Sequence, residues 1–137
     1  MVCMEFTMKK HVLSLTYEPK VIPVLTGKCH QTIRLGRRFK KGELIMFHGW
    51  AGLPYRSPWS FRTPYYCVKE VVDIEITPDC MIDLKTLAGM SWESPEMDEI
   101  ARLDGIDPPT GIELFRVLSR LNKIPDTGVA GQIVRFA

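Results

Sequence analysis

The sequence lacks the long apolar runs that mark membrane helices and secretory signals. Its 137 residues contain no stretch of about 18 apolar residues, which excludes a transmembrane helix. Residues 1–10 have no apolar core of the signal-peptide kind. A Gly-rich phosphate loop, an internal repeat and a linker are also missing. We therefore expect a cytoplasmic protein that has no membrane partner.

Cysteine is scarce and poorly spaced for metal binding or disulfides. Cys3, Cys29, Cys67 and Cys80 lie far apart, with no Cys-x-x-Cys pair. This spacing argues against a zinc ribbon and against a disulfide framework, so we expect reduced thiols. The three histidines have no helical ligand spacing. The sequence therefore predicts no metal and no other cofactor.

The composition is that of an ordinary globular domain, but the charge is unevenly distributed. Hydrophobic residues make up 45% and charged residues 25% of the chain, which favours a single domain over 1–137. Residues 1–69 carry a net charge of +9 and residues 70–137 a net charge of −7. This asymmetry indicates either a polyanion-binding face or two halves that neutralise each other in one fold.

Hydrophobic periodicity predicts strands and helices in an irregular order. We expect strands over 11–17, 31–35, 44–48, 66–77 and 132–136. We also expect a short helix ending near Gly27 and a helix over 95–103. A third helix should begin after Thr110, and its inward-facing residues should be Ile112, Phe115, Leu118 and Leu121. Three prolines and two glycines predict an irregular loop over 49–64. The order shows no βαβ alternation and favours an α+β domain with a mostly antiparallel sheet or barrel.

The segment 27–34 concentrates chemically versatile side chains. If it is extended, His30, Thr32 and Arg34 point to one face. The Arg34 guanidinium can then bind a phosphate or carboxylate, and Thr32 can act as a hydrogen-bond donor or, beside a base, as a nucleophile. The alternative is a solvated turn followed by an ordinary strand.

Asp104 lies at the expected C-terminal end of the 95–103 helix, where an anion opposes the helix dipole. If the carboxyl is partly buried, its pKa is raised and it becomes a candidate general base. The alternative is that Asp104 and Gly105 form an ordinary turn pair.

Aromatic and basic side chains alternate in the 49–64 loop. Trp50 and Trp59 lie near Arg56 and Arg62 in the sequence. Such a set can stack on nucleobases and bind phosphates. It can also fold back as a small satellite core.

Two segments resemble the ASCH domain family. The first contains Gly-Lys-Cys-His-Gln-Thr-Ile-Arg at 27–34 and Lys-Lys-Gly-Glu at 40–43, and the second contains Leu-Asp-Gly-Ile at 103–106. With the closing strand, the resemblance covers roughly 12–136 and leaves 49–64 as an insertion. It implies a small PUA-like, mostly antiparallel β-barrel with helices at its rim, and a cleft beside the 31–35 strand.

The resemblance also implies a function. Family members are thought to bind RNA or modified nucleosides, small bacterial members deacetylate N4-acetylcytidine, and some relatives cleave RNA. Carried over by position, the catalytic Thr is Thr32 and the acid is Asp104. The family's catalytic Lys falls on Cys29, and Lys28 is one place early.

A basic ridge next to the Thr-Ile-Arg strand would attract an anionic ligand. It consists of Arg37, Arg38, Lys40 and Lys41. The first hypothesis is therefore a module that binds RNA or a modified nucleoside in a basic cleft, using Cys29, Arg34, the ridge and the aromatic loop. The second is an amidohydrolase on N4-acylated cytidine, with Lys28, Thr32 and Asp104 as its catalytic residues. The third is a protein-interaction domain that uses the 49–64 loop.

Overall fold

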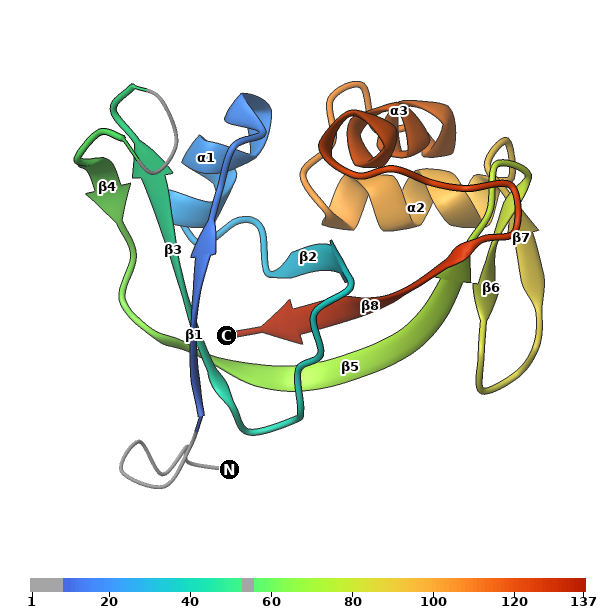
Figure 1. The fold of residues 1–137 in the computed structure, drawn as a ribbon, viewed down its shortest axis with the longest axis horizontal. Coiled ribbons are helices and arrows are strands. Elements are labelled where there is room, and N and C mark those ends of the chain that lie inside the picture. Colours follow the sequence, from blue (N-terminus) through green and yellow to red (C-terminus); the bar gives the residue numbers. More distant parts are fainter. Residues whose placement is uncertain (1–8, 53–55) are drawn as a thin grey trace.

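The fold combines a bent, mostly antiparallel sheet with three helices in the part of the chain that is described (Figure 1). The computed structural model describes residues 9–52 and 56–137. The elements are β1 (Lys10–Ser14), α1 (Glu18–Leu25), β2 (Gln31–Leu35), β3 (Leu44–Trp50), β4 (Trp59–Arg62), β5 (Tyr66–Ile76), β6 (Cys80–Asp83), β7 (Gly89–Ser91), α2 (Pro95–Leu103), α3 (Gly111–Leu121) and β8 (Val129–Phe136). The α+β class expected from the sequence is confirmed.

The long strand β5 connects the two halves of the sheet. Its first residues pair with β3, the rest of it pairs with β8, and its last three residues, 74–76, also pair with β6. All of these pairings are antiparallel, whereas β1 and β3 are parallel. Among the described strands, β1 pairs only with β3 and β2 pairs only with β8. The sheet is therefore not closed, and the expected barrel is not confirmed.

Two hydrophobic clusters lie on opposite faces of β8. Ile133 belongs to the cluster beneath α2 and α3, while its neighbour Val134 belongs to the cluster that α1, β1 and β3 surround. Figure 1 shows α2 and α3 together over one part of the sheet and α1 beside β1 and β3. Successive side chains of β8 point to opposite faces of the sheet, so this one strand contributes to both hydrophobic clusters.

The cap residues set the starts of α2 and α3 as the sequence predicts. Ser94 accepts a hydrogen bond from the Met97 amide, and Thr110 accepts one from the Glu113 amide. The predicted inner face of α3 is partly wrong, however. Ile112 and Leu121 are 47% and 56% exposed, because the helix turns a different face toward α2 and the sheet. The buried residues of α3 are Gly111, Leu114, Val117 and Leu118.

The expectation of an irregular 49–64 loop is also wrong in part. β3 continues to Trp50, and β4 returns beside it with Gly49 opposite Phe61. Glycine is needed there because a Cβ on Gly49 would lie 2.2 Å from the Phe61 ring. Pro58 and Pro64 do not prevent this pairing, since both lie outside the two strands. Residues 53–55 lie outside the described residues.

Three further findings bear on the sequence predictions. Proline is expected only in the first turn of a helix, yet Pro23 lies in the interior of α1. Cys29 and Cys80 are free thiols, but Cys67 is disulfide-bonded, so the expected reduced state is wrong for Cys67. In the described part of the chain, no helix is both long and apolar enough to cross a membrane.

We expect Gly131→Ala to destabilise the fold by about 1–3 kcal/mol, because the added methyl group would overpack the contact between β8 and β2. A Cβ at Gly131 would lie 2.4 Å from Leu35 Cδ2 and 2.9 Å from the Arg34 carbonyl oxygen. Urea unfolding measures the change. Gly89→Ala in β7 is the matched control, because its nearest contact would be 3.8 Å away. Equal effects of the two substitutions would contradict the prediction.

Candidate functional site

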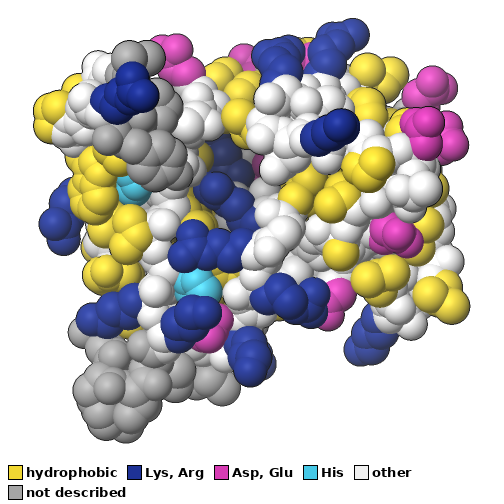
Figure 2. All heavy atoms as spheres, viewed as in Figure 1, with side chains coloured by type: hydrophobic (Ala, Val, Ile, Leu, Met, Phe, Trp, Pro, Cys, Tyr) yellow, Lys and Arg dark blue, Asp and Glu magenta, His cyan; other side chains and the backbone are white. Residues whose placement is uncertain are grey.

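A hollow lies between β1 and β2, which do not pair with each other among the described strands. This cavity of about 580 Å³ is bounded by the segment from Val12 to Tyr17, by β2 and by α3. Figure 2 shows dark-blue Lys and Arg side chains in and below a hollow between the two halves of the molecule. Its lining combines polar, aromatic and apolar parts: Lys20, Thr32, Arg34, Arg37, Asp104; Tyr17, His48, Trp50, Trp59; Ile106, Leu114, Val117, Leu118, Leu121.

A buried ion pair forms the polar floor of the cavity. Lys20 Nζ lies 3.2 Å from Asp104 Oδ1, and the two residues are only 4% and 5% exposed. The Gln31 amide nitrogen lies 3.4 Å from the same carboxylate oxygen and donates to the Ile100 carbonyl at 3.2 Å. The pair therefore has the additional hydrogen bonding that a buried charge pair needs.

The end of α2 directs the Asp104 side chain into the cavity. Asp104 is the C-cap, and Gly105 follows at φ 77°, a left-handed conformation that ends the helix. A Cβ on Gly105 would lie 3.3 Å from Lys20 Cγ and 3.4 Å from Cys29 Sγ. Glycine therefore provides both the turn and the close packing of the ion pair against α1.

Burial raises the pKa of the Asp104 carboxyl above its ordinary value. The Lys20 ammonium is the strongest opposing influence, followed by the Gln31 amide and the more distant Arg34 charge. The sequence makes Asp104 a candidate general base if its carboxyl is buried. The structure meets this condition, because the carboxyl is buried and its proton affinity is increased.

Thr32 and Arg34 form the wall next to this floor. Arg34 Nε donates to Thr32 Oγ1 at 3.1 Å, and Arg34 Nη2 donates to the Ser14 carbonyl at 3.1 Å, across the gap between β2 and β1. Burial lowers the pKa of Arg34 to about 10, and the charge of Arg37 acts in the same direction while Asp104 opposes it. A guanidinium with this pKa remains charged at neutral pH.

Three aromatic side chains form another wall of the cavity. The His48 and Trp59 rings are stacked with centres 4.1 Å apart, and the Trp50 ring meets His48 edge-on at 4.8 Å. His48 is buried, and its Nδ1 has no hydrogen-bond partner among the described residues. The wall thus offers π surface to a bound molecule.

The structure brings together about half of the site residues predicted from the sequence. Thr32, Arg34, Arg37, Trp50, Trp59 and Asp104 all line the cavity. Cys29 does not line it but packs beneath the floor, with its Sγ 3.5 Å from the carbonyls of Gln31 and Leu103. Burial raises the pKa of the Cys29 thiol.

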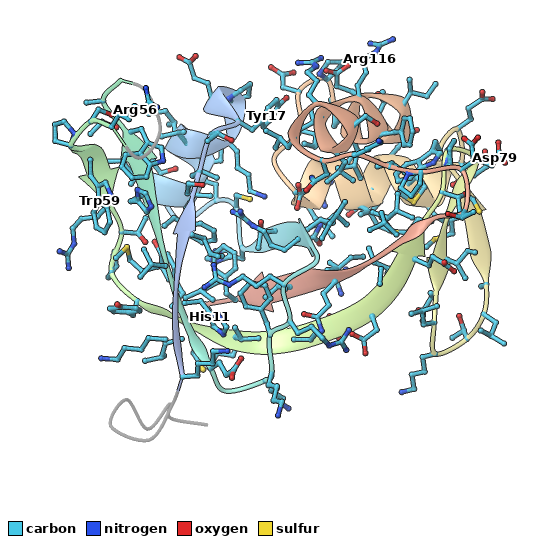
Figure 3. All side chains as sticks on the ribbon, viewed as in Figure 1. His11, Tyr17, Arg56, Trp59, Asp79 and Arg116 are labelled. Carbon is cyan, nitrogen blue, oxygen red and sulfur yellow. The ribbon has the colours of Figure 1, made fainter. Side chains whose placement is uncertain are left out.

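The other predicted site residues lie outside the cavity lining. Lys28, Arg38, Lys40, Arg56 and Arg62 are exposed and do not line it. Arg38 pairs with Asp73 at 3.1 Å on the surface. Figure 3 places Arg56 beside the β3–β4 end of the molecule, away from α3. In the described residues, the basic ridge therefore reaches the cavity only through Arg37.

Sequence reasoning missed Lys20, His48, Gln31 and the apolar wall from α3. One signal for Lys20 was present, since it is four residues from Val24 and both are buried on the same face of α1. A lysine in the apolar stripe of a helix needs a partner, because a lone buried ammonium is costly. The partner could not be named from the sequence, because Asp104 is distant along the chain.

Neither metal coordination nor comparison with known proteins assigns a function to this cavity. No group of three or more His, Cys, Asp or Glu side chains within 9–52 and 56–137 could hold a metal ion. The chain matches no protein-family model, and no curated protein or solved structure matches it. The chemistry of the lining residues therefore carries the functional argument.

We expect Lys20→Met to destabilise the protein by about 3–5 kcal/mol near pH 8, because it leaves the Asp104 carboxylate buried without its partner. The folded-state pKa of Asp104 lies above its unfolded value, so the folded protein holds more protons. Stability therefore falls as the pH rises from about 4, the unfolded pKa, through the folded pKa.

Urea unfolding of the wild type and of Lys20→Met at pH 5 and pH 8 measures this dependence. The deficit of the variant should be smaller at pH 5, and adding Asp104→Asn to it should restore part of the stability at pH 8. A deficit that is equal at both pH values would contradict the assignment of the ion pair.

Proposed function

We propose that the cavity between β1 and β2 binds a pyrimidine nucleobase, presented by a modified nucleoside or by RNA. The observation that carries the proposal is the buried Lys20–Asp104 pair on the floor of a cavity of about 580 Å³. A volume of this size lies within the range of small-molecule sites, which is about 300–1,000 Å³. The proposal includes membership in the ASCH family, with a PUA-like barrel that is open between β1 and β2.

The polar groups on the floor match the edge of a pyrimidine. The Asp104 carboxylate can accept a hydrogen bond from an exocyclic amine such as cytosine N4. Lys20 can donate to a ring carbonyl from the same floor, since its ammonium has three N–H donors. Folding has already removed water from both groups. A ligand that hydrogen-bonds to them therefore does not incur the free-energy cost of desolvating them.

The remaining walls suit a flat, partly apolar ring. Trp59 and His48 provide stacked aromatic surface, and Leu114 and Leu118 provide an apolar surface from α3. Stacking of a base on an aromatic side chain contributes about 1–3 kcal/mol. Together, the walls favour a planar heterocycle over an extended peptide.

Isothermal titration of the protein with cytidine and with N4-acetylcytidine tests the proposal. We expect saturable binding of at least one of them, and we expect Asp104→Asn to weaken it by about tenfold or more, because a charged acceptor is lost. Asp79→Asn is the matched control, since Asp79 is exposed on the β5–β6 turn, away from the cavity-lining Tyr17 and Trp59 in Figure 3. Absence of binding by the folded wild type would contradict the proposal.

A second candidate function, hydrolysis of an N4-acylated cytosine, is favoured by one specific feature. Lys20 brings an ammonium to Asp104, whereas the family's lysine position carries Cys29, a buried thiol. Thr32 is also on the cavity wall, and its hydroxyl oxygen already accepts a bond from Arg34. Lys20 can therefore take the catalytic role that the resemblance assigns to a lysine at the position of Cys29.

The hydrolysis would use these groups in two steps. A water molecule, or the Thr32 hydroxyl followed by water, attacks the acyl carbonyl and transfers its proton to Asp104. The tetrahedral intermediate then breaks its C–N bond, and Lys20 donates a proton to the leaving amine. The products are the carboxylic acid and cytidine.

Chromatographic assay of N4-acetylcytidine deacetylation tests this second function. We expect Lys20→Met to lower kcat by about 10²–10⁴-fold, since it removes a general acid. Thr32→Ala should cause a similar loss and Thr32→Ser a smaller one. Lys28→Met should retain wild-type turnover, because Lys28 is exposed and outside the cavity lining. Turnover that depends on Lys28 and not on Lys20 would contradict this account.

A further inference from the structure

Two arginine side chains on the cavity wall have no acidic partner in the described part of the chain. Arg34 and Arg37 both line the cavity. No ion pair between described residues includes either guanidinium. Asp104 is the one acidic residue in the lining, and Lys20 already pairs with it. The lining therefore carries an excess of positive charge next to Arg34 and Arg37.

The free edge of β1 holds both guanidiniums in place. Arg34 Nη2 donates to the Ser14 carbonyl at 3.1 Å, and Arg37 Nη1 donates to the Val12 carbonyl at 3.4 Å. These two carbonyls are two residues apart on the strand, so they point to the same edge at a spacing of about 7 Å. The two cations are thus arranged side by side along one edge of the cavity.

Each guanidinium is also supported from behind by an aromatic ring. Arg34 Cζ lies 5.9 Å from the centre of the Phe47 ring, and Arg37 Cζ lies 5.9 Å from the centre of the Phe39 ring. Phe47 and Phe39 are both buried, which limits how far either arginine can move toward them. The arginines therefore present their remaining N–H donors in a restricted geometry.

Two like charges held close together need a counter-ion. Burial is the main cause that lowers the pKa of Arg34; the Asp104 charge opposes it, and the nearby Arg37 charge lowers the pKa further. Guanidinium N–H groups match the oxygens of phosphate in pairs, which makes arginine the common choice at phosphate sites. A phosphate group bound here would offset the excess positive charge.

We propose that Arg34 and Arg37 form an oxyanion subsite that binds a phosphate group of the nucleotide whose base occupies the cavity. This inference rests on the proposed function and narrows its ligand class from nucleosides to phosphorylated nucleotides. The phosphate can belong to a free nucleoside monophosphate or to an RNA chain, and both present the same chemistry to the two arginines.

Isothermal titration at constant ionic strength with cytidine, cytidine 5′-monophosphate and the dinucleotide CpC tests the subsite. We expect the monophosphate or CpC to bind about tenfold or more tightly than cytidine. Arg37→Gln should remove most of that advantage, because it removes one of the two guanidiniums that would bind the phosphate. Tighter binding of CpC than of the monophosphate would identify RNA as the source of the phosphate.

Arg38→Gln is the matched control, because it makes the same charge change at the next residue, outside the cavity lining. It should behave as the wild type. Equal affinities for cytidine and both phosphorylated ligands would overturn the subsite while leaving the proposed function intact. If the phosphorylated ligands bind more tightly than cytidine and Arg37→Gln does not reduce this difference in affinity, the subsite is also overturned.

A separate measurement distinguishes the subsite from the base site. If neither cytidine nor N4-acetylcytidine binds, the proposed function fails, and inorganic phosphate then tests the subsite alone. A rise in thermal stability with phosphate that Arg37→Gln abolishes and Arg38→Gln keeps would support the subsite. No rise with phosphate, or a rise that Arg37→Gln keeps, would overturn it.

Discussion

The missing pairing between β1 and β2 is the constraint on which the rest of the structure depends. If these strands paired, backbone hydrogen bonds would join them and fill the space between them. Instead, β1 pairs only with β3 and β2 only with β8 among the described strands, and the Arg34 side chain crosses the gap to the Ser14 carbonyl. An unpaired strand edge leaves polar backbone groups to be satisfied. Here side chains satisfy some of them, and a cavity with polar walls is the consequence.

The Lys20–Asp104 pair is a costly feature to maintain in that cavity. A buried pair of this kind contributes little to stability compared with apolar residues of similar volume, although loss of one partner is severe. Gly105, Gln31 and the capping turn of α2 all serve to hold it. The fold uses several contacts to position an ion pair that contributes little to stability. A ligand-binding role explains this arrangement better than a role in core stability alone.

The sequence revealed the local features of the fold more reliably than the partners across it. Ser94 and Thr110 start helices because capping needs only neighbouring backbone amides. Asp104 and Thr32 were found because a helix end and an alternating strand are also local patterns. Lys20 was missed because its partner comes from a distant helix end, and β4 was missed because its pairing with β3 outweighs the nearby prolines. The buried face of α3 likewise depends on tertiary packing that periodicity alone does not determine.

The central claim is that the floor of this cavity is a ligand site. The most direct test is a pH titration of the Asp104 carboxyl carbon by ¹³C NMR, with and without saturating cytidine. In the free protein the account predicts a midpoint above the ordinary range for aspartate, since burial raises the pKa. Cytidine should lower that midpoint, because its exocyclic amine donates to the charged form of the carboxyl. An ordinary midpoint that cytidine leaves unchanged would contradict the account.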